Sequence, residues 1–272
     1  MTDTIFNADC FDILPTIPTG SVDMLLVDLP YGATRNPWDS ILPLDQLWLH
    51  YNRIVKEDGA MVFTSAAPFD KLLATSNLEC FRYEWIWHKN KASGHLNAKK
   101  MPLRAHETIL VFYRKAPTYN PQITIGHKPM NNVYGKQVIK GEPRNYNHAH
   151  QVANTTRRTT RLPRDVLNIR VHDNIKSDKI HPTQKPLALM EYFIRTYTNE
   201  GDTVLDNTMG VGTTCVAAKS LNRRFIGIEK DAHYYQHASD WLNSTISGSA
   251  LSKTTNDLLN LSACAHFPNS IR

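Results

Sequence analysis

Short apolar runs alternate with amphipathic stretches along the first 85 residues. The runs at 4–6, 22–27 and 60–64 are typical of short buried strands. Between the second and third runs, the apolar residues from 44 to 55 follow the spacing of a helix, and Gly59 is expected to cap its end. Strand, helix and strand in this order predict a parallel α/β sheet.

The alternation fades in the middle of the chain and then returns. Strands are expected at 81–87 and 108–113, whereas Pro, Asn, His, Thr and Arg dominate from 115 to about 180. Pro186 suits the first turn of a helix. The later elements predicted are a helix with an apolar stripe at 187, 190, 194 and 197, a strand at 203–206, a helix at 213–221, a strand at 224–229 and a helix at 232–242.

These elements predict an α/β fold with an open, mostly parallel sheet and helices on both faces, interrupted by an irregular basic insert. We assign residues 1–114 and 176–245 to the α/β domain, 115–175 to the insert and 246–272 to a loosely ordered tail.

The charge of the chain is unevenly distributed. The net charge is +6, yet residues 85–185 hold 19 Lys and Arg against 5 Asp and Glu, and the remainder holds 12 against 20. A basic block in an otherwise acidic chain predicts a polyanionic partner, with nucleic acid the first candidate and a solvated surface the alternative. The densest cationic cluster, a candidate for phosphate contacts, is Arg157, Arg158, Arg161 and Arg164.

Other features narrow the class of protein. The chain contains no run of ~18 apolar residues, so no transmembrane helix is expected. The first ten residues do not resemble a secretion signal. The four cysteines lie far apart and form no CxxC pair, so neither a disulfide framework nor a metal site is expected. We expect a cytoplasmic protein with reduced thiols.

A Gly-rich turn separates the predicted strand at 203–206 from the helix after it. It reads Asp206-Asn-Thr-Met-Gly210-Val-Gly212-Thr-Thr214, and Glu229 ends the next strand. Glycines allow a ligand to approach the backbone, a helix N-terminus offers free N–H groups, and a carboxylate in the position of Glu229 suits ribose hydroxyls. The pattern lacks the third small residue of dinucleotide sites and the Lys of a P-loop. It predicts a cofactor that contains a nucleoside; the alternative is a tight turn without a ligand.

A second motif, Asp28-Leu29-Pro30-Tyr31, follows the apolar run at 22–27. Ligands of open α/β sheets bind beyond the carboxyl ends of the strands. Pro30 restrains Leu29 to an extended backbone, so the Leu29 carbonyl and the Asp28 carboxylate can face one point. Two acceptors at one point suit an amino group, and Tyr31 can stack on the ring that carries it. An ordinary strand-ending turn is the alternative.

Together the two motifs resemble the beta-class amino-methyltransferases of DNA, which transfer a methyl group from S-adenosylmethionine to an exocyclic nitrogen of adenine or cytosine. The family signatures D/N/S-P-P-Y and x-x-G-x-G correspond to residues 28–31 and 206–214, and His181-Pro-Thr-Gln-Lys-Pro186 resembles its cofactor segment. The order of catalytic motif, recognition insert and cofactor motif also agrees. Leu29 replaces a Pro that acts through its carbonyl, and Asn207 and Thr208 replace Pro and Phe.

The resemblance implies a Rossmann-like methyltransferase fold with permuted motif order, and it implies roles for individual residues. Asp28 and the Leu29 carbonyl would accept hydrogen bonds from the amino group, and Tyr31, after Pro30, would stack on a flipped base. Lys89 would contact DNA near the base, whereas Trp87 is favoured as a core residue over a base contact. The cofactor residues implied are Asp9, Cys10, Thr183, Lys185, Asp206, Thr208, Gly210, Gly212 and Glu229. For Lys185 the alternative is a solvated lysine at a helix start.

The favoured activity is methylation of adenine N6 in double-stranded DNA, because Asp stands first in the signature; cytosine N4 is the close alternative. The resemblance also implies a bacterial or phage origin and leaves a homodimer and a cognate restriction endonuclease open as partners. A nicotinamide oxidoreductase would leave residues 28–31 without a role, while a non-catalytic nucleic-acid binder and an RNA substrate stay open. Cytosine C5 chemistry is disfavoured, because no cysteine follows a proline.

Overall fold

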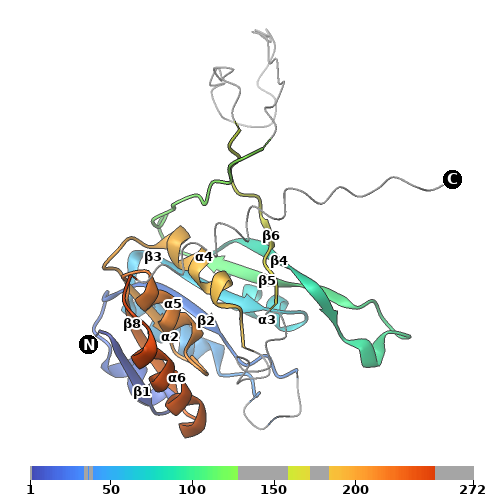
Figure 1. Cartoon of the computed structure of the whole chain (residues 1–272). Helices are drawn as coiled ribbons and strands as arrows, with labels where there is room; N and C mark the ends of the chain where they lie inside the picture. Colours follow the sequence, from blue (N-terminus) through green and yellow to red (C-terminus); the bar gives the residue numbers. More distant parts are fainter. Residues whose placement is uncertain (1, 34–35, 37–38, 128–158, 172–183, 249–272) are drawn as a thin grey trace, which may run out of the picture.

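Eight strands form one sheet in the computed structural model, which describes residues 2–33, 36, 39–127, 159–171 and 184–248 (Figure 1). The strand order is β1-β8-β7-β2-β3-β5-β4-β6, and β5 alone runs opposite to the others. The strands are β1 (Thr4–Asn7), β2 (Val22–Asp28), β3 (Val55–Ser65), β4 (Phe81–Ser93), β5 (Arg104–Phe112), β6 (Val166–Asn168), β7 (Thr203–Asp206) and β8 (Arg224–Glu229).

Helices cover both faces of this sheet, which confirms the predicted fold class. One face carries α4 (Leu187–Tyr197), α5 (Thr213–Ser220) and α6 (Ala232–Ser244), and the other carries α1 (Cys10–Ile13), α2 (Leu44–Ile54) and α3 (Phe69–Ser76). Alternate side chains of β2 serve the two cores: Met24 and Leu26 pack on the first face, whereas Leu25 and Val27 pack on the second. Two short 3-10 helices, η1 (Leu14–Thr16) and η2 (His95–Asn97), complete the described elements.

The prediction that Gly59 caps a helix is wrong. Helix α2 ends at Ile54, and β3 begins at Val55 and contains Gly59. A Cβ atom at Gly59 would lie 2.6 Å from Val55 Cγ1 and 2.9 Å from the Asp23 main-chain oxygen. The glycine therefore allows β3 to approach β2 closely, beside the irregularity in their pairing between Val22 and Met24.

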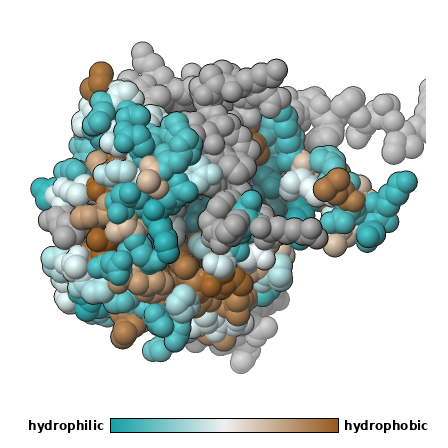
Figure 2. All heavy atoms as spheres, turned by 90° about the horizontal axis from the view of Figure 1, so that it is seen from below, coloured by the Kyte–Doolittle hydropathy of each residue, from teal (hydrophilic) through white to brown (hydrophobic). Residues whose placement is uncertain are grey.

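Strands β4 and β5 extend well beyond the predicted segments and form a hairpin that projects from the sheet (Figure 1). The apolar pattern marked only the parts at 81–87 and 108–113, because only there do the strands pack on a core. Figure 2 shows the projecting part as a mainly hydrophilic arm with an apolar spot. The exposed apolar side chains of this arm are Leu96, Met101 and Leu103.

Described residues near both ends of the predicted insert contact the α/β domain. Strand β6, which lies inside the insert, pairs with β4. Asn120 donates from its main-chain N–H to Thr196 and from its side chain to Arg195 and Thr198, at the end of α4. Residues 128–158, 172–183 and 249–272 lie outside the described part of the chain, so most of the insert and the tail do too. Among the described helices, none is long and apolar enough to cross a membrane.

A buried hydrogen-bond chain fastens α4 to the sheet. Trp85 Nε1 donates to the Tyr197 hydroxyl at 2.8 Å, and the hydroxyls of Tyr197 and Tyr83 share a second bond at 2.8 Å. Trp85 and Tyr197 are almost completely buried, whereas Tyr83 is 36% exposed. The bond from Trp85, together with the apolar side chains of α4 in the same core, therefore holds the C-terminal end of α4 on the sheet.

We expect Tyr197→Phe to lower the free energy of unfolding by about 1–3 kcal/mol, because it leaves the buried Trp85 N–H without an acceptor. Tyr83→Phe, the matched control, keeps that acceptor and should cost only about 0.5–1.5 kcal/mol. Urea unfolding of both variants measures the difference. Equal losses would contradict the role given to Trp85.

Candidate functional site

The predicted motifs meet at one edge of the sheet, where the parallel strands β2, β7 and β8 end. Asp28, Asp206 and Glu229 are the last residues of these three strands. The Thr208 hydroxyl, from the Gly-rich turn, donates to the main-chain oxygen of Asp28 at 3.1 Å. Two motifs separated by about 180 residues are therefore in direct contact, at the edge where open α/β sheets bind ligands.

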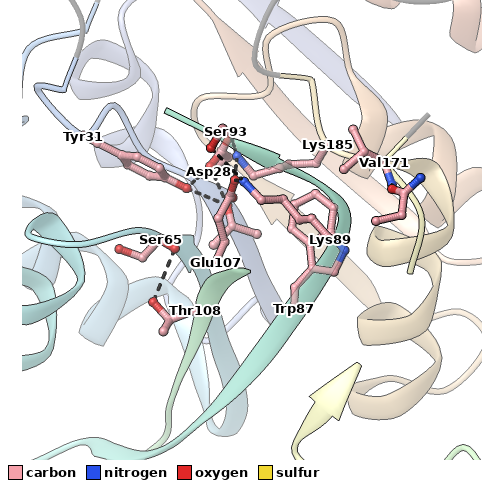
Figure 3. A network of polar contacts seen from close by, with 12 residues as sticks. Asp28, Tyr31, Ser65, Trp87, Lys89, Ser93, Glu107, Thr108, Val171 and Lys185 are labelled. Atoms are coloured by element: carbon pink, nitrogen blue, oxygen red, sulfur yellow. Dashed lines mark hydrogen bonds and ion pairs between the residues drawn. The ribbon is translucent and has the colours of Figure 1, made fainter. Parts of the chain in front are cut away.

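The Asp28 carboxylate receives hydrogen bonds from three directions (Figure 3). The Tyr31 hydroxyl donates to Oδ1 at 2.7 Å, and the Thr64 hydroxyl donates to the same oxygen. The Lys185 ammonium donates to Oδ2 at 2.8 Å. Since a carboxylate offers about four lone-pair positions, Asp28 is held in one orientation and keeps capacity for a further donor.

The rest of the Asp28–Tyr31 turn is fixed by packing. Leu29 as a whole residue is 2% exposed and packs in the apolar core, and Pro30 is half-buried. The Tyr31 ring stacks on Phe69 with centroids 5.3 Å apart. Burial, and then the charge of Asp28, raise the pKa of Tyr31 well above its usual value, so its hydroxyl stays a donor.

Lys185 lies inside the site, so the alternative of a solvated lysine is wrong. Its side chain is 9% exposed, and its ammonium lies 5.4 Å from the centroid of the Tyr31 ring. Besides Asp28, it faces Glu107, whose Oε2 is 3.6 Å away. Lys89, predicted to bind DNA, is also 9% exposed and pairs with Glu107 Oε1 at 3.0 Å. Trp87 is a core residue, as favoured, and its indole donates to the Ile169 carbonyl.

Sequence reasoning missed Thr64 and Glu107. Thr64 carries a weak signal, since it is the polar residue that ends the apolar run of β3, in register with Asp28. Nothing in the local sequence pattern indicates that Glu107 belongs to the site. It lies at the start of β5, and only the antiparallel direction of that strand brings it to the edge where the parallel strands end.

The Gly-rich turn leaves open space on one side. Gly210 has φ +54°, and a Cβ there would meet no atom within 4 Å, whereas a Cβ at Gly212 would lie 2.8 Å from that of Ala238. Gly210 therefore fits a position beneath a ligand, and Gly212 is required by packing on α6. Glu229 fixes the turn, because its carboxylate accepts from the N–H groups of Gly210 at 2.9 Å and Asp231 at 2.8 Å.

The remaining predicted cofactor residues surround this turn. Asp9 caps α1 by accepting from the N–H of Phe11, and its bond to Lys230 lowers the pKa of its carboxyl. Burial raises the pKa of the Cys10 thiol to about 11, which keeps it protonated. Burial also raises the pKa of the Asp206 carboxyl to about 7. Thr183 lies outside the described residues.

The predicted phosphate-binding cluster is described only in part. Arg164 is exposed, and Arg161 pairs through its main chain with Thr124. Arg157 and Arg158 lie outside the described residues. DNA contacts by these arginines and by Lys89 stay predictions.

Comparison with known proteins gives consistent matches over most of the chain. A family model for DNA methylases of the N6/N4 type matches residues 22–240. The type II methyltransferase M1.MboII of Moraxella bovis is 29% identical over 262 residues, covering 88% of this chain and 96% of its own. The DNA adenine methyltransferase YhdJ of Escherichia coli (strain K12) is 30% identical over 247 residues, covering 85% of this chain and 79% of its own. The crystal structure of an M1.HpyAVI–SAM complex is similar with a TM-score of 0.57 and 26% identity, over 87% of this chain and 98% of its own.

We expect Asp206→Asn to stabilise the protein in a pH-dependent way. The folded protein holds the pKa of Asp206 at about 7, against ~4 for an aspartate in an unfolded chain, so stability falls as the pH rises between these values. Removing the carboxyl should raise the free energy of unfolding by an amount on the order of 3 kcal/mol more at about pH 8 than at about pH 4.

Urea unfolding at both pH values measures this difference. Asp240→Asn, a change at an exposed carboxylate on α6, is the control and should act equally at both. A gain for Asp206→Asn that does not depend on pH would contradict the prediction.

Proposed function

This chain belongs to the N6/N4 DNA methylase family, and we propose that it methylates the N6 amino group of adenine at specific sites in double-stranded DNA. The broader activity follows from the family: it is a DNA methyltransferase that uses S-adenosylmethionine. One arrangement carries the proposal, namely the Asp28 carboxylate at the end of β2, fixed by Tyr31, Thr64 and Lys185 beside the Gly-rich turn.

The residues of the turn fit the cofactor. The open space over Gly210 admits a ligand against the backbone, and the Glu229 carboxylate beside it suits the ribose hydroxyls. Asp9 and Cys10 would lie near the adenine, while Asp206, Thr208, Gly210 and Gly212 would line the methionine. An ionised Asp206 beside the cofactor's ammonium would replace the unfavourable burial of a lone carboxylate by an ion pair. When bound, the cofactor supplies an electrophilic methyl group.

The chain's own residues would act on the amino group of the base. Its lone pair is delocalised into the ring, so nitrogen is a poor nucleophile until it becomes tetrahedral. The Asp28 carboxylate and the Leu29 carbonyl would accept its two N–H groups and stabilise the positive charge that develops on it. Tyr31 would stack on the base. A base inside a duplex cannot reach this edge of the sheet, so the base must be flipped out of the helix.

Adenine is favoured over cytosine on two grounds. The first residue of the Asp28–Tyr31 motif is Asp, and an Asp at this position favours adenine in the resembled family. The relative YhdJ is named a DNA adenine methyltransferase. Since the family covers both amino groups, cytosine N4 is the alternative that the first experiment must separate.

We expect labelled S-adenosylmethionine and genomic DNA, incubated with the protein and digested to nucleosides, to yield N6-methyladenine as the labelled base. Label in N4-methylcytosine would overturn the adenine assignment but keep the family activity. A parallel reaction with RNA tests the polymer. Absence of label in every polymer would overturn the proposed function.

We expect Asp28→Ala to abolish methyl transfer, by about 10²-fold or more, because it removes the main acceptor of the amino group. Binding of S-adenosylmethionine, measured by calorimetry, should stay within about threefold, since the cofactor contacts other residues. Asp23→Asn, a carboxylate at the other end of β2, is the control and should keep its activity. Transfer by the Asp28→Ala variant at a rate near the wild type would refute the role of Asp28.

A further inference from the structure

The Lys185 ammonium lies between two carboxylates (Figure 3). It donates to Asp28 Oδ2 at 2.8 Å and lies 3.6 Å from Glu107 Oε2. Burial lowers the pKa of Lys185, but the negative charges of Asp28 and Glu107 outweigh it and raise that pKa well above its usual value. The ammonium therefore stays charged and needs a carboxylate partner.

The Glu107 carboxylate can accept a further hydrogen bond and could therefore be a partner of Lys185. Its Oε1 accepts from Lys89 at 3.0 Å, which fixes the carboxylate, while its Oε2 is buried and accepts no hydrogen bond from the described residues. The 3.6 Å gap to Lys185 is too long for a hydrogen bond. Native proteins rarely leave a buried carboxylate oxygen without a donor, so this oxygen calls for an explanation.

In contrast to Glu107, Asp28 accepts hydrogen bonds at both of its carboxylate oxygens. Its Oδ1 accepts from both Tyr31 and Thr64, whereas Oδ2 accepts only from Lys185 among the described residues, so Oδ2 has the larger remaining capacity. An amino group that binds Oδ2 would share it with an ammonium. As the amino nitrogen gains positive charge, that ammonium repels it and weakens the acceptor on which it depends.

We propose that Glu107 is a positioning residue, which receives the Lys185 ammonium when the target amino group binds Asp28. A movement of under about 1 Å would bring the ammonium into hydrogen-bond distance of Glu107 Oε2. Lys185 keeps its proton and its burial, and only its carboxylate partner changes. This inference rests on the proposed function.

Kinetics on a DNA duplex that the wild type methylates give the first test. We expect Glu107→Gln to lower kcat/KM for DNA by about tenfold, because Lys185 then has no second anion to move to. The KM for S-adenosylmethionine should change little, whereas the Tm should fall, because the buried Lys89 ammonium loses its charged partner. Glu107→Asp, which keeps the charge on a shorter side chain, should recover part of the loss.

Asp70→Asn is the matched control. Asp70 is a buried carboxylate that also pairs with a lysine, Lys71, and its other side-chain contact is to Thr108. If Asp70→Asn and Glu107→Gln lowered kcat/KM equally, or if Glu107→Gln kept the wild-type value, the inference would be overturned. A loss confined to the Glu107 variants supports it.

A crystal structure of the wild type with a methylatable duplex and a non-reactive cofactor analogue gives the direct test. We expect Lys185 Nζ within about 3.2 Å of Glu107 Oε2 in this complex. An ammonium still bound to Asp28 would overturn the inference while leaving the proposed function intact. If no polymer is methylated, the proposed function itself has failed, which the nucleoside assay reports separately.

Discussion

The ion pair between Asp28 and Lys185 is the interaction on which the arrangement of the site depends. It joins residues 157 positions apart, one at the end of β2 and one just before α4. The Lys185 side chain is buried, and a buried ammonium is tolerated only when it is paired and hydrogen-bonded. That requirement fixes Tyr31, Thr64 and Lys185 around one carboxylate, and it makes the correct docking of α4 on the sheet a condition for an ordered site.

The two motifs could be predicted from the sequence because each belongs to a local pattern. An apolar run followed by Asp28 identifies a strand end, and glycines between a strand and a helix identify a turn that a ligand can approach. The carboxyl ends of parallel strands lie at one edge, so a parallel sheet places Asp28, Asp206 and Glu229 at the same edge, and the strand order β8-β7-β2 makes them neighbours. The fold class followed from the same reasoning and is confirmed.

The residues whose roles could not be predicted owe them to strand direction and tertiary packing. The local sequence pattern contains neither. Glu107 reaches the site only because β5 runs against its neighbours. Lysine side chains are usually solvated, and the burial of Lys185 follows from the charged partners that the fold places around it. Gly59 looked like a helix cap, yet its lack of a side chain serves the contact between β2 and β3. In each case tertiary contacts decided the role of a residue whose local signal was ambiguous or absent.

The main-chain pairing of Thr124 with Arg161 has a consequence for how such a chain can evolve. Two hydrogen bonds, at 3.0 and 2.9 Å, join these residues, and His127 donates to Thr159 beside them. The segment from 128 to 158 thus leaves and re-enters the described structure at one closed base. Once a loop is closed in this way, lengthening it costs little further entropy, since the closure term grows only with the logarithm of its length. Insertions between residues 127 and 159 therefore add little to the free energy of closure, provided that the Thr124–Arg161 pairing is kept.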